Sequence, residues 1–259
     1  MHPVLLEFKG IAIHSYGLLL AIAFISALLL SSREARLNGI NPDRIMDLGF
    51  YVILSAIIGA RLFHVLVFHE IYTADPLEIF RIWNGGLVFY GGLILAIPVA
   101  IIYIRKQGLP LWKVSDVVAS SLPLGLSIGR IGCFMAGCCY GKPTDLPWGV
   151  IFSNPRSLAR AHLGEPVHPT QLYESSGSFL IFIFIFFFLR KRKHFDGELF
   201  WTFTLLYSAM RFFLEFLRDD PRGFLFGFSE SQIVGVPVFI VSIFMLLYLK
   251  KLKRVDTIG

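Results

Sequence analysis

Residues Phe179 to Leu189 read FLIFIFIFFFL, and this stretch decides the fold class because it contains no polar side chain. A helix needs roughly 17–25 mostly apolar residues to cross the hydrocarbon core of a bilayer. Segments of this kind recur along the 259 residues, at about 14–31, 47–68, 86–104, 114–132, 175–189, 198–217 and 231–249. The sequence therefore predicts an all-α polytopic membrane protein with about seven transmembrane helices, forming a single integral domain over residues 1–259.

Composition supports this class, because 55% of the residues are hydrophobic and only 16% are charged. The first apolar run lacks a basic start and a small-residue cleavage site, so we expect it to remain as the first span. No internal repeat stands out, which gives no support to the inverted-repeat plan of many transporters.

Lysine and arginine in the connecting segments predict the orientation of the chain in its membrane. Of the 24 cationic residues, 14 fall in alternate connections at 33–44, 105–113, 190–193 and 250–254, and 7 fall on the other side. We therefore expect a cytoplasmic C-terminus, with the N-terminus and the 133–174 loop facing outward. The net charge of +6 is explained mostly by this asymmetric distribution of lysine and arginine, so it does not indicate a nucleic-acid partner. The basic cytoplasmic segments would also be attracted to anionic membrane lipid.

The long connection at 133–174 mixes proline, glycine, aromatic and charged residues, which predicts a small outward-facing head. Within it, Val150 to Phe152 is expected to form a short strand. The loop ends in HPTQLYE at His168 to Glu174, where Pro169 suits the first position of a helix. Glu174 then lies in or near the first turn, where the helix dipole favours an anion.

Three arginines, Arg61, Arg130 and Arg211, lie inside predicted spans, where a guanidinium costs about 2.5–3.5 kcal/mol. We expect Arg61 to serve packing and hydrogen bonding within the bundle. A guanidinium suits a phosphate above other partners, so Arg130 and Arg211 predict a site for a lipid headgroup.

Arg211, Glu215 and Arg218 are spaced i, i+4 and i+7 and therefore share one helix face. The alternative for this group is a self-neutralising ion pair at the end of a span, with Arg218 reaching to the interface.

Two tyrosines and three cysteines complete the set of candidates. Tyr16 lies at the outer mouth of the first span, and Tyr90 stands between two pairs of glycines that allow close backbone approach. Cys133, Cys138 and Cys139 with His168 have the donor types of a zinc site, but their Cys-x4-Cys-Cys spacing argues against one. We therefore predict no metal and no cofactor. A disulfide from Cys133 to either other cysteine and a group of small buried thiols both remain open.

Taken together, the motifs resemble the bacterial prolipoprotein diacylglyceryl transferase family over most of the chain and in the same order. They are HSYG at 14–17, GARL at 59–62, GGLVFYGG at 85–92, GRIGCFMAG at 129–137, HPTQLYE at 168–174 and RFFLEFLR at 211–218.

The resemblance implies a transferase that moves the diacylglyceryl group of phosphatidylglycerol onto the lipobox cysteine of a preprolipoprotein signal peptide. This is the first step of lipoprotein maturation: a thioether forms and glycerol 1-phosphate leaves. Arg130 matches the family's headgroup-binding arginine and Arg211 its second essential arginine. Tyr16, Glu215 and Gly141 also fall on functional positions.

The sequence departs from better-studied members of that family at three positions. Tyr90 stands in place of a histidine proposed as a base, Cys133 in place of an asparagine, and Cys138 in place of a glutamate. The implied phosphate binding is thus retained, whereas proton transfer could involve Tyr90 or rely on the arginines alone. Three other functions remain open. They are a paralogue with the same lipid site but another acceptor or lipid, a lipid-binding transport protein or channel that is not an enzyme, and a thiol or metal protein built on the cysteines.

Overall fold

The computed structural model describes residues 2–8, 11–219, 224–225 and 228–256, and most of them are helical. They divide into two compact units, Met1–Ser31 with Ser115–Gly259, and Ser32–Val114, referred to below as unit 1 and unit 2. The single domain over 1–259 remains a prediction. Lys9 and Arg222, two of the cationic residues predicted to face outward, lie outside the described residues.

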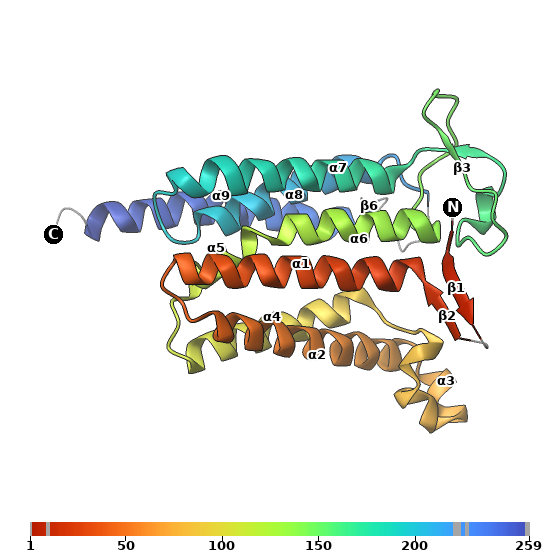
Figure 1. The fold of residues 1–259 in the computed structure, drawn as a ribbon, viewed down its shortest axis with the longest axis horizontal. Coiled ribbons are helices and arrows are strands. Elements are labelled where there is room, and N and C mark those ends of the chain that lie inside the picture. Colours follow the sequence, from red (N-terminus) through yellow and green to blue (C-terminus); the bar gives the residue numbers. More distant parts are fainter. Residues whose placement is uncertain (1, 9–10, 220–223, 226–227, 257–259) are drawn as a thin grey trace. The chain divides into compact units, whose positions relative to one another are not determined.

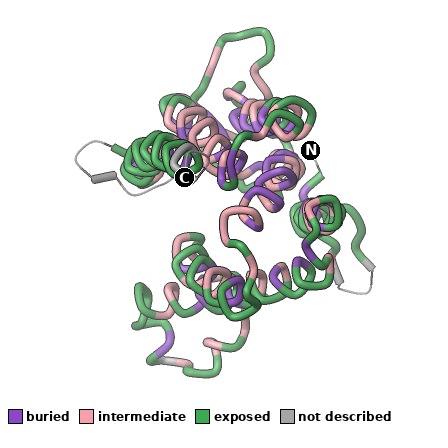
Figure 2. The backbone as a smooth tube through the Cα atoms, turned by 90° about the vertical axis from the view of Figure 1, so that its left-hand side faces the viewer, coloured by how far each residue is buried: buried purple, intermediate pink, exposed green. Residues whose placement is uncertain are grey.

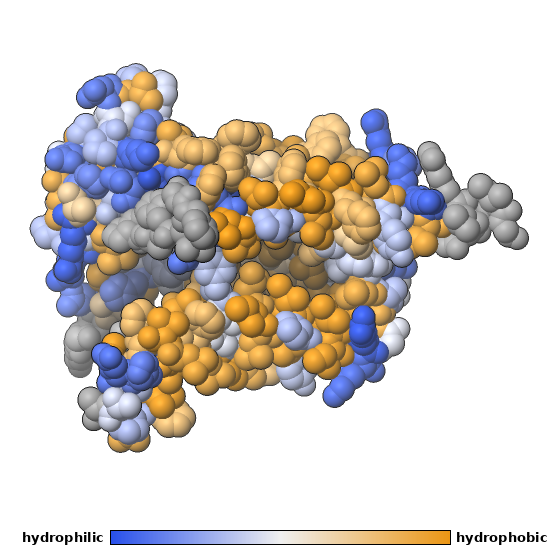
Figure 3. Space-filling view, turned by 180° about the vertical axis from the view of Figure 1, so that it is seen from behind, coloured by the Kyte–Doolittle hydropathy of each residue, from blue (hydrophilic) through white to orange (hydrophobic). Residues whose placement is uncertain are grey.

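Five helical segments among the described residues are long and apolar enough to cross a membrane. They are α1 (Ser15–Leu37), α2 (Pro42–Val67), α4 (Phe89–Lys106), Thr170–Arg192, and α9 (Glu230–Asp256). The fourth runs through α7 (Thr170–Ile183), the π-helical η4 (Phe184–Leu189) and the 3-10 turn η5 (Arg190–Arg192). Hydrophobic side chains cover the flanks of the helices and hydrophilic ones gather toward their ends (Figure 3). The predicted all-α polytopic membrane class is confirmed.

The predicted fourth span is broken into α5 (Leu111–Ala119) and α6 (Leu122–Ala136), which are bent by 41° at the break. Pro123 has no N–H for a preceding carbonyl, and it occupies the start of α6. At the break, the Ser120 hydroxyl donates to the Val117 carbonyl at 2.6 Å and the Ser121 hydroxyl donates to the Val118 carbonyl at 3.1 Å. Counting this bent pair as one span gives six, so 114–132 is not the continuous helix predicted.

The predicted sixth span corresponds to α8 (Glu198–Glu215), which is too highly charged to count as a span by composition. Its 18 residues include Glu198, Arg211 and Glu215. The carboxylate of buried Asp116 accepts hydrogen bonds from the backbone N–H of Gly197 and Phe200 at 2.8 and 3.0 Å. These bonds satisfy N–H groups at the helix start that have no partner within the helix.

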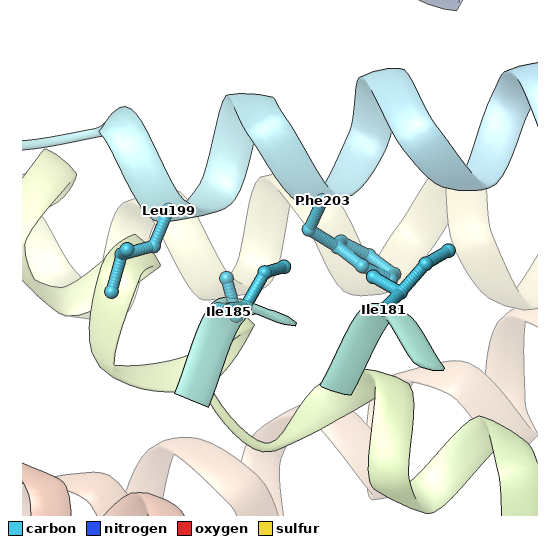
Figure 4. Packing of buried hydrophobic residues seen from close by; sticks show 5 residues of the cluster. Ile181, Ile185, Leu199 and Phe203 are labelled. Carbon is cyan, nitrogen blue, oxygen red and sulfur yellow. The ribbon is translucent and has the colours of Figure 1, made fainter. Parts of the chain in front are cut away.

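Unit 1 has an apolar core between α7 and α8. Ile181 and Ile185 pack there against Leu199 and Phe203 (Figure 4), and the end of α5 contributes Ala119. Between helices in a bilayer, such contacts stabilise the fold through van der Waals packing and not through the hydrophobic effect. Buried positions of the helices lie on the faces turned to their neighbours, as the tube view shows (Figure 2). This core aligns α7 and α8, the two helices that carry most of the charged residues described below.

Three short antiparallel pairs also belong to unit 1: β1 (Val4–Phe8) with β2 (Ile11–His14), β3 (Val150–Ile151) with β4 (Pro166–Val167), and β5 (Phe224–Leu225) with β6 (Phe228–Ser229). The β3 strand confirms the strand predicted near Val150, whereas β1 and β2 were not predicted. The turn η3 (Arg160–His162) lies between β3 and β4. The β1–β2 pair and the β3 segment lie at one end of the unit 1 helices, opposite the C-terminal part of α9 (Figure 1).

Unit 2 consists of α2 packed along α4, joined by α3 (His69–Ala74) and the 3-10 turns η1 (Pro76–Phe80) and η2 (Ile82–Asn84). Asn41 caps α2 by accepting from the Asp43 N–H at 2.9 Å, and Pro42 occupies its first turn. A Cβ at Gly92 would come within 2.9 Å of the Ala56 carbonyl oxygen, so glycine is needed where the helices touch. The predicted close backbone approach beside Tyr90 is therefore present.

Candidate functional site

One buried carboxylate, Glu174, lies at the centre of the charged residues of unit 1. Arg130 Nη2 lies 2.9 Å from its Oε1, Arg211 Nε 4.0 Å from the same oxygen, and Arg218 Nη1 3.7 Å from its Oε2. The Tyr207 hydroxyl also donates to Oε1 at 2.7 Å. Arg130 is on α6, Glu174 on α7 and Arg211 on α8. Three segments far apart in the sequence thus meet at one side chain.

The spacing of residues along α8 explains how two of these arginines reach the same carboxylate. Arg211 and Glu215 are one turn apart, and Arg211 Nη1 lies 2.6 Å from Glu215 Oε2. Arg211 Nη2 donates to the Ser231 hydroxyl of α9 at 3.2 Å. Arg218 follows α8 on the same face and is buried, with only 3% of its side chain exposed. The alternative in which Arg218 reaches out to the interface is therefore wrong.

Arg130, Arg211, Arg218, Glu174 and Glu215 form a cluster of charged side chains. Three guanidinium groups lie within 4.0 Å of the Glu174 carboxylate, and Arg211 also pairs with Glu215. Buried charges of this kind are costly unless they are paired and hydrogen-bonded. A phosphodiester carries one negative charge and accepts bidentate hydrogen bonds from arginine.

Exposure identifies which arginine can meet such an anion. The Arg130 side chain is 21% exposed, whereas those of Arg211 and Arg218 are 10% and 3% exposed. Its Nη2 is held by Glu174, and its Nη1 lies 3.9 Å from the Cys133 sulfur, a weak contact. Arg130 is therefore the most accessible of the three cations and the one best placed to make the first contact with a ligand.

Main-chain pairing holds the loop that follows α6 against the end of α8. The Gly141 N–H donates to the His168 carbonyl at 3.0 Å, and the Lys142 N–H donates to the Leu217 carbonyl at 2.8 Å. A Cβ at Gly141 would lie 2.6 Å from both the His168 Cβ and the Leu217 carbonyl oxygen. Glycine at this position therefore lets the 140–142 segment dock beside Arg218.

The HPTQLYE motif fixes the turn between α6 and Gly141. The Thr170 hydroxyl donates to the Cys139 carbonyl and the Gln171 side chain to the Cys138 carbonyl, both at 2.7 Å. Thr170 is the first residue of α7, so Pro169 precedes the helix instead of starting it. Glu174 lies just beyond the first turn, and its contacts with the arginines, more than the helix dipole, define its surroundings.

Tyr16, near the start of α1, packs against the same part of α6. A Cβ at Gly132 would lie 3.4 Å from the Tyr16 ring, and Gly132 is two residues beyond Arg130. The Tyr16 side chain is partly exposed, at 41% for the residue. Unit 1 thus brings together five of the residues predicted for the site: Tyr16, Arg130, Glu174, Arg211 and Glu215.

The three cysteines lie where α6 ends. Cys133 is within the helix, Gly137 ends it in a left-handed conformation, and Cys138 and Cys139 follow. All are free thiols. Hydrogen bonds with Cys133 and Cys138 lower the pKa of the Cys139 thiol, and the positive charges of Arg218 and Arg130 lower it further.

Comparison with known proteins decides the family. The profile described as prolipoprotein diacylglyceryl transferase matches residues 3–248. The chain belongs to the prolipoprotein diacylglyceryl transferase family. It is 36% identical to the phosphatidylglycerol–prolipoprotein diacylglyceryl transferase of Clostridium tetani, over 95% of this chain and 96% of that protein. The proteins of the same name from Vibrio atlanticus and Geobacter sulfurreducens are 33% and 34% identical, over 96% and 97% of this chain and 91% and 96% of theirs.

In this member of the diacylglyceryl transferase family, Arg61 has the structural environment expected from the sequence. It is 5% exposed, and its guanidinium donates to main-chain carbonyls of the connection between α2 and α4. The acceptors are Glu78, Ile79, Arg81, Gly85 and Gly86. Arg61 also lies over the Tyr72 ring, 5.2 Å from its centroid. Its donors are therefore committed to holding this connection in place.

The remaining predicted residues of the transferase are placed as follows. His168 is half-buried, with Nδ1 3.4 Å from the Tyr173 hydroxyl. Tyr90 is half-buried in the first turn of α4, within unit 2. Its suggested part in proton transfer remains a prediction.

Sequence reasoning missed part of the charged cluster. The spacing places Arg218 on the same helix face as Arg211 and Glu215, but it does not predict the contact of Arg218 with Glu174. Tyr207, which also contacts Glu174, is absent from the predicted residues. Tyr207 is four residues before Arg211 on the same helix face, and this spacing could have identified it.

Proposed function

We propose that this protein transfers the diacylglyceryl group of phosphatidylglycerol to the lipobox cysteine of preprolipoproteins, at the outer face of a bacterial cytoplasmic membrane. The observation that carries the proposal is the convergence of Arg130 and Arg211, from two different helices, on the single carboxylate of Glu174. Membership of the family and the similarity to named transferases support it. We also propose the orientation with the N-terminus outside and the C-terminus in the cytoplasm.

The reaction is a substitution at a glycerol carbon of the lipid. The sulfur of the acceptor cysteine forms a bond to that carbon as the carbon–oxygen bond to the phosphate breaks. The electron pair leaves with the oxygen as glycerol 1-phosphate. The thiolate is the nucleophile, and a free thiol has a pKa near ~8.5, so the thiol proton must be removed.

Arg130 and Arg211 have different roles in the proposed reaction. We assign capture of the headgroup phosphate to Arg130, the most exposed of the three, and stabilisation of the departing phosphate to Arg211. Glu215 holds Arg211 through its 2.6 Å ion pair. Donors that are fixed before the reaction need little reorganisation in the transition state, and they act more strongly in a site that excludes water.

An open pocket between α6 and α7 offers room for an acyl chain of the lipid. Its apolar lining residues are Leu124, Ile128, Ile131 and Phe179. Ile131 directly follows Arg130, so the apolar lining begins beside the proposed headgroup site. A glycerolipid has the same succession of groups, with its phosphate next to apolar chains.

Tyr90 is the proposed proton acceptor if the phenol takes part. A Tyr90→Phe variant tests this role, because it keeps the ring and removes the hydroxyl. Retention of full activity would exclude the phenol from proton transfer. Loss of activity with normal folding, together with restored activity and a lower pH optimum in Tyr90→His, would support it.

The decisive experiment is mass spectrometry of a lipobox peptide incubated with the purified protein and phosphatidylglycerol. We expect a peptide that gains a diacylglyceryl group on its cysteine and equimolar release of glycerol 1-phosphate. A serine-for-cysteine peptide and the Arg130→Ala protein should give no product. An unmodified peptide with folded wild-type protein would contradict the proposal, and phosphatidylglycerol binding without transfer would favour a lipid-binding protein.

A further inference from the structure

The end of α6 holds a group of sulfur ligands that the proposed transfer does not use. The Sγ atoms of Cys133, Cys138 and Cys139 all lie within 4.8 Å of one another. They are also the only cysteines of the chain. Two sulfurs bound to one zinc ion at about 2.3 Å lie about 3.8–4.0 Å apart, so small side-chain movements bring all three to this distance.

The backbone is shaped to bring these sulfurs together. Adjacent cysteines normally point in different directions, which is why their spacing alone argued against a metal site. Cys139, however, has φ = 63° and is the one non-glycine residue with positive φ in the described part of the chain. This left-handed conformation costs a non-glycine residue roughly 1–3 kcal/mol and persists only where the surroundings impose it. It turns Cys139 so that its sulfur shares one space with the other two.

Neighbouring residues impose this conformation from outside the group. The Thr170 hydroxyl and the Gln171 amide hold the carbonyls of Cys139 and Cys138, each at 2.7 Å. The Gly137 N–H donates to the Cys133 carbonyl at 2.9 Å and closes the end of α6. The site is therefore built into the contact between α6 and α7, with no metal needed to order the turn.

Charge favours a divalent ion over a monovalent one. Three thiolates and a divalent ion leave one negative charge, and a monovalent ion leaves two. Arg130 Nη1 lies 3.9 Å from the Cys133 sulfur and offsets part of this charge. A disulfide would use two of the three sulfurs and leave the third without a role.

We infer that Cys133, Cys138 and Cys139 bind one thiophilic divalent ion of the zinc type through three thiolates. Imidazole and carboxylate atoms do not join the group among the described residues, and His168 is not a member. One coordination position of a tetrahedral ion therefore stays open to a non-protein ligand. The bound ion would tie the end of α6, which carries Arg130, to the turn held by α7.

The test is the metal content of the full-length protein purified in detergent under thiol-reducing conditions without chelator. We expect one equivalent of zinc per chain, and a thiolate-to-metal charge-transfer band after exchange with cobalt(II). Cys133→Ser, Cys138→Ser and Cys139→Ser should each lose the metal and the band. The His168→Gln control should keep both. These readouts require no transferase activity, so failure of this inference and failure of the proposed function can be told apart.

A serine variant that does not fold would be uninformative, so Cys139→Gly provides a second route. Glycine suits the positive φ at this position, and this variant should fold while losing the metal. Alkylation of denatured wild-type protein from a second preparation, purified without reductant, completes the test. Three alkylated cysteines with no zinc after supplying the ion overturn the inference. So does a single alkylated cysteine, which would reveal a disulfide.

Discussion

Unit 1 and unit 2 both bury arginine, but they give it different partners. In unit 2, Arg61 donates to main-chain carbonyls of the residues that join α2 to α4. In unit 1, Arg130, Arg211 and Arg218 face the carboxylates of Glu174 and Glu215. An arginine surrounded by carbonyls has its donors committed and serves the fold. Arginines that converge from different helices present their donors in one place, where an anion can bind them.

Removing the shared carboxylate should have the largest effect on unit 1. Glu174→Gln leaves three neighbouring guanidinium groups with Glu215 as their only remaining acidic partner in the cluster. Breaking a buried ion pair costs about 3–5 kcal/mol. We expect a markedly lower melting temperature in detergent.

Tyr207→Phe is the matched control for Glu174→Gln, because it removes one hydrogen bond to the same oxygen without removing a charge. Its expected cost is about 1.5–3 kcal/mol, the range for a hydrogen bond to a charged group. Equal melting temperatures for the two variants would show that Glu174 is not the centre of the cluster.

Replacing one arginine by glutamine in each unit tests the comparison directly. Arg130→Gln should lower transferase activity about 10²–10³-fold, the cost of losing one fixed donor in an active site. Its melting temperature should fall less than that of Glu174→Gln, because Arg211 and Arg218 remain beside Glu174. Arg61→Gln should show the reverse pattern, a lower melting temperature with activity per folded molecule retained, since the connection between α2 and α4 loses its hydrogen bonds. Activity per folded molecule and thermal unfolding should be measured on both. A stable Arg61→Gln protein without activity would place Arg61 in the catalytic machinery.

A smaller effect is expected where the loop after α6 docks beside Arg218. Gly141→Ala forces a methyl group against the His168 side chain and the Leu217 carbonyl, and overpacking of this kind costs about 1–3 kcal/mol. Gly129→Ala is the matched control, because nothing lies within 4 Å of its Cβ position. Thermal unfolding should separate the two variants. Equal stability would mean that the loop can move away from Arg218 without loss.

The smallest effect concerns an exposed ion-pair group in the same unit. His162 lies 3.0 Å from both Glu165 and Asp219, and these contacts raise its pKa, with the hydrogen bond to Glu165 as the main cause. Protonated His162 is therefore favoured in the folded state. Its contribution is complete below about pH 6.5, the unfolded value, and is lost as pH rises through the raised folded pKa.

The size of this contribution should stay below about 1 kcal/mol, because Glu165 and Asp219 are 59% and 41% exposed. Comparing the melting temperatures of the wild type and His162→Gln across this pH range measures it. The difference should shrink toward high pH, and a constant difference would contradict the assignment.

The sequence predicts the membrane class of this protein well, because a run such as Phe179–Leu189 has few alternatives. It also shows the weak points of the fourth span at Ser120, Ser121 and Pro123, but not that the helix breaks there. The β1–β2 pair escapes prediction because each strand has only four or five residues and lies beside a span. Such short strands depend on their partner more than on their own residues.

For the candidate site, the sequence predicts contacts between residues of one helix from their spacing, but it does not predict contacts between different helices. The i, i+4 relation correctly places Glu215 against Arg211. No local pattern brings Arg130, 44 residues before Glu174, to that carboxylate, because this depends on how α6 packs against α7. Resemblance to the family selected Arg130 and Arg211. It did not identify Glu174 as the residue that joins them.

The charge of α8 has a consequence for how the protein is made. Charged residues in a segment oppose its release from the translocon into lipid, most strongly near its middle. Arg211 lies within α8, and Glu198 and Glu215 begin and end it. With these three charges α8 lacks the composition of a membrane span, which the preceding Thr170–Arg192 segment has. Because Glu174 and Glu215 supply the countercharge for Arg211, we expect α8 to enter the bilayer together with its predecessor as a hairpin. The ion pairs of the candidate site would then form during membrane insertion, so a substitution that removes them should also impair insertion of α8.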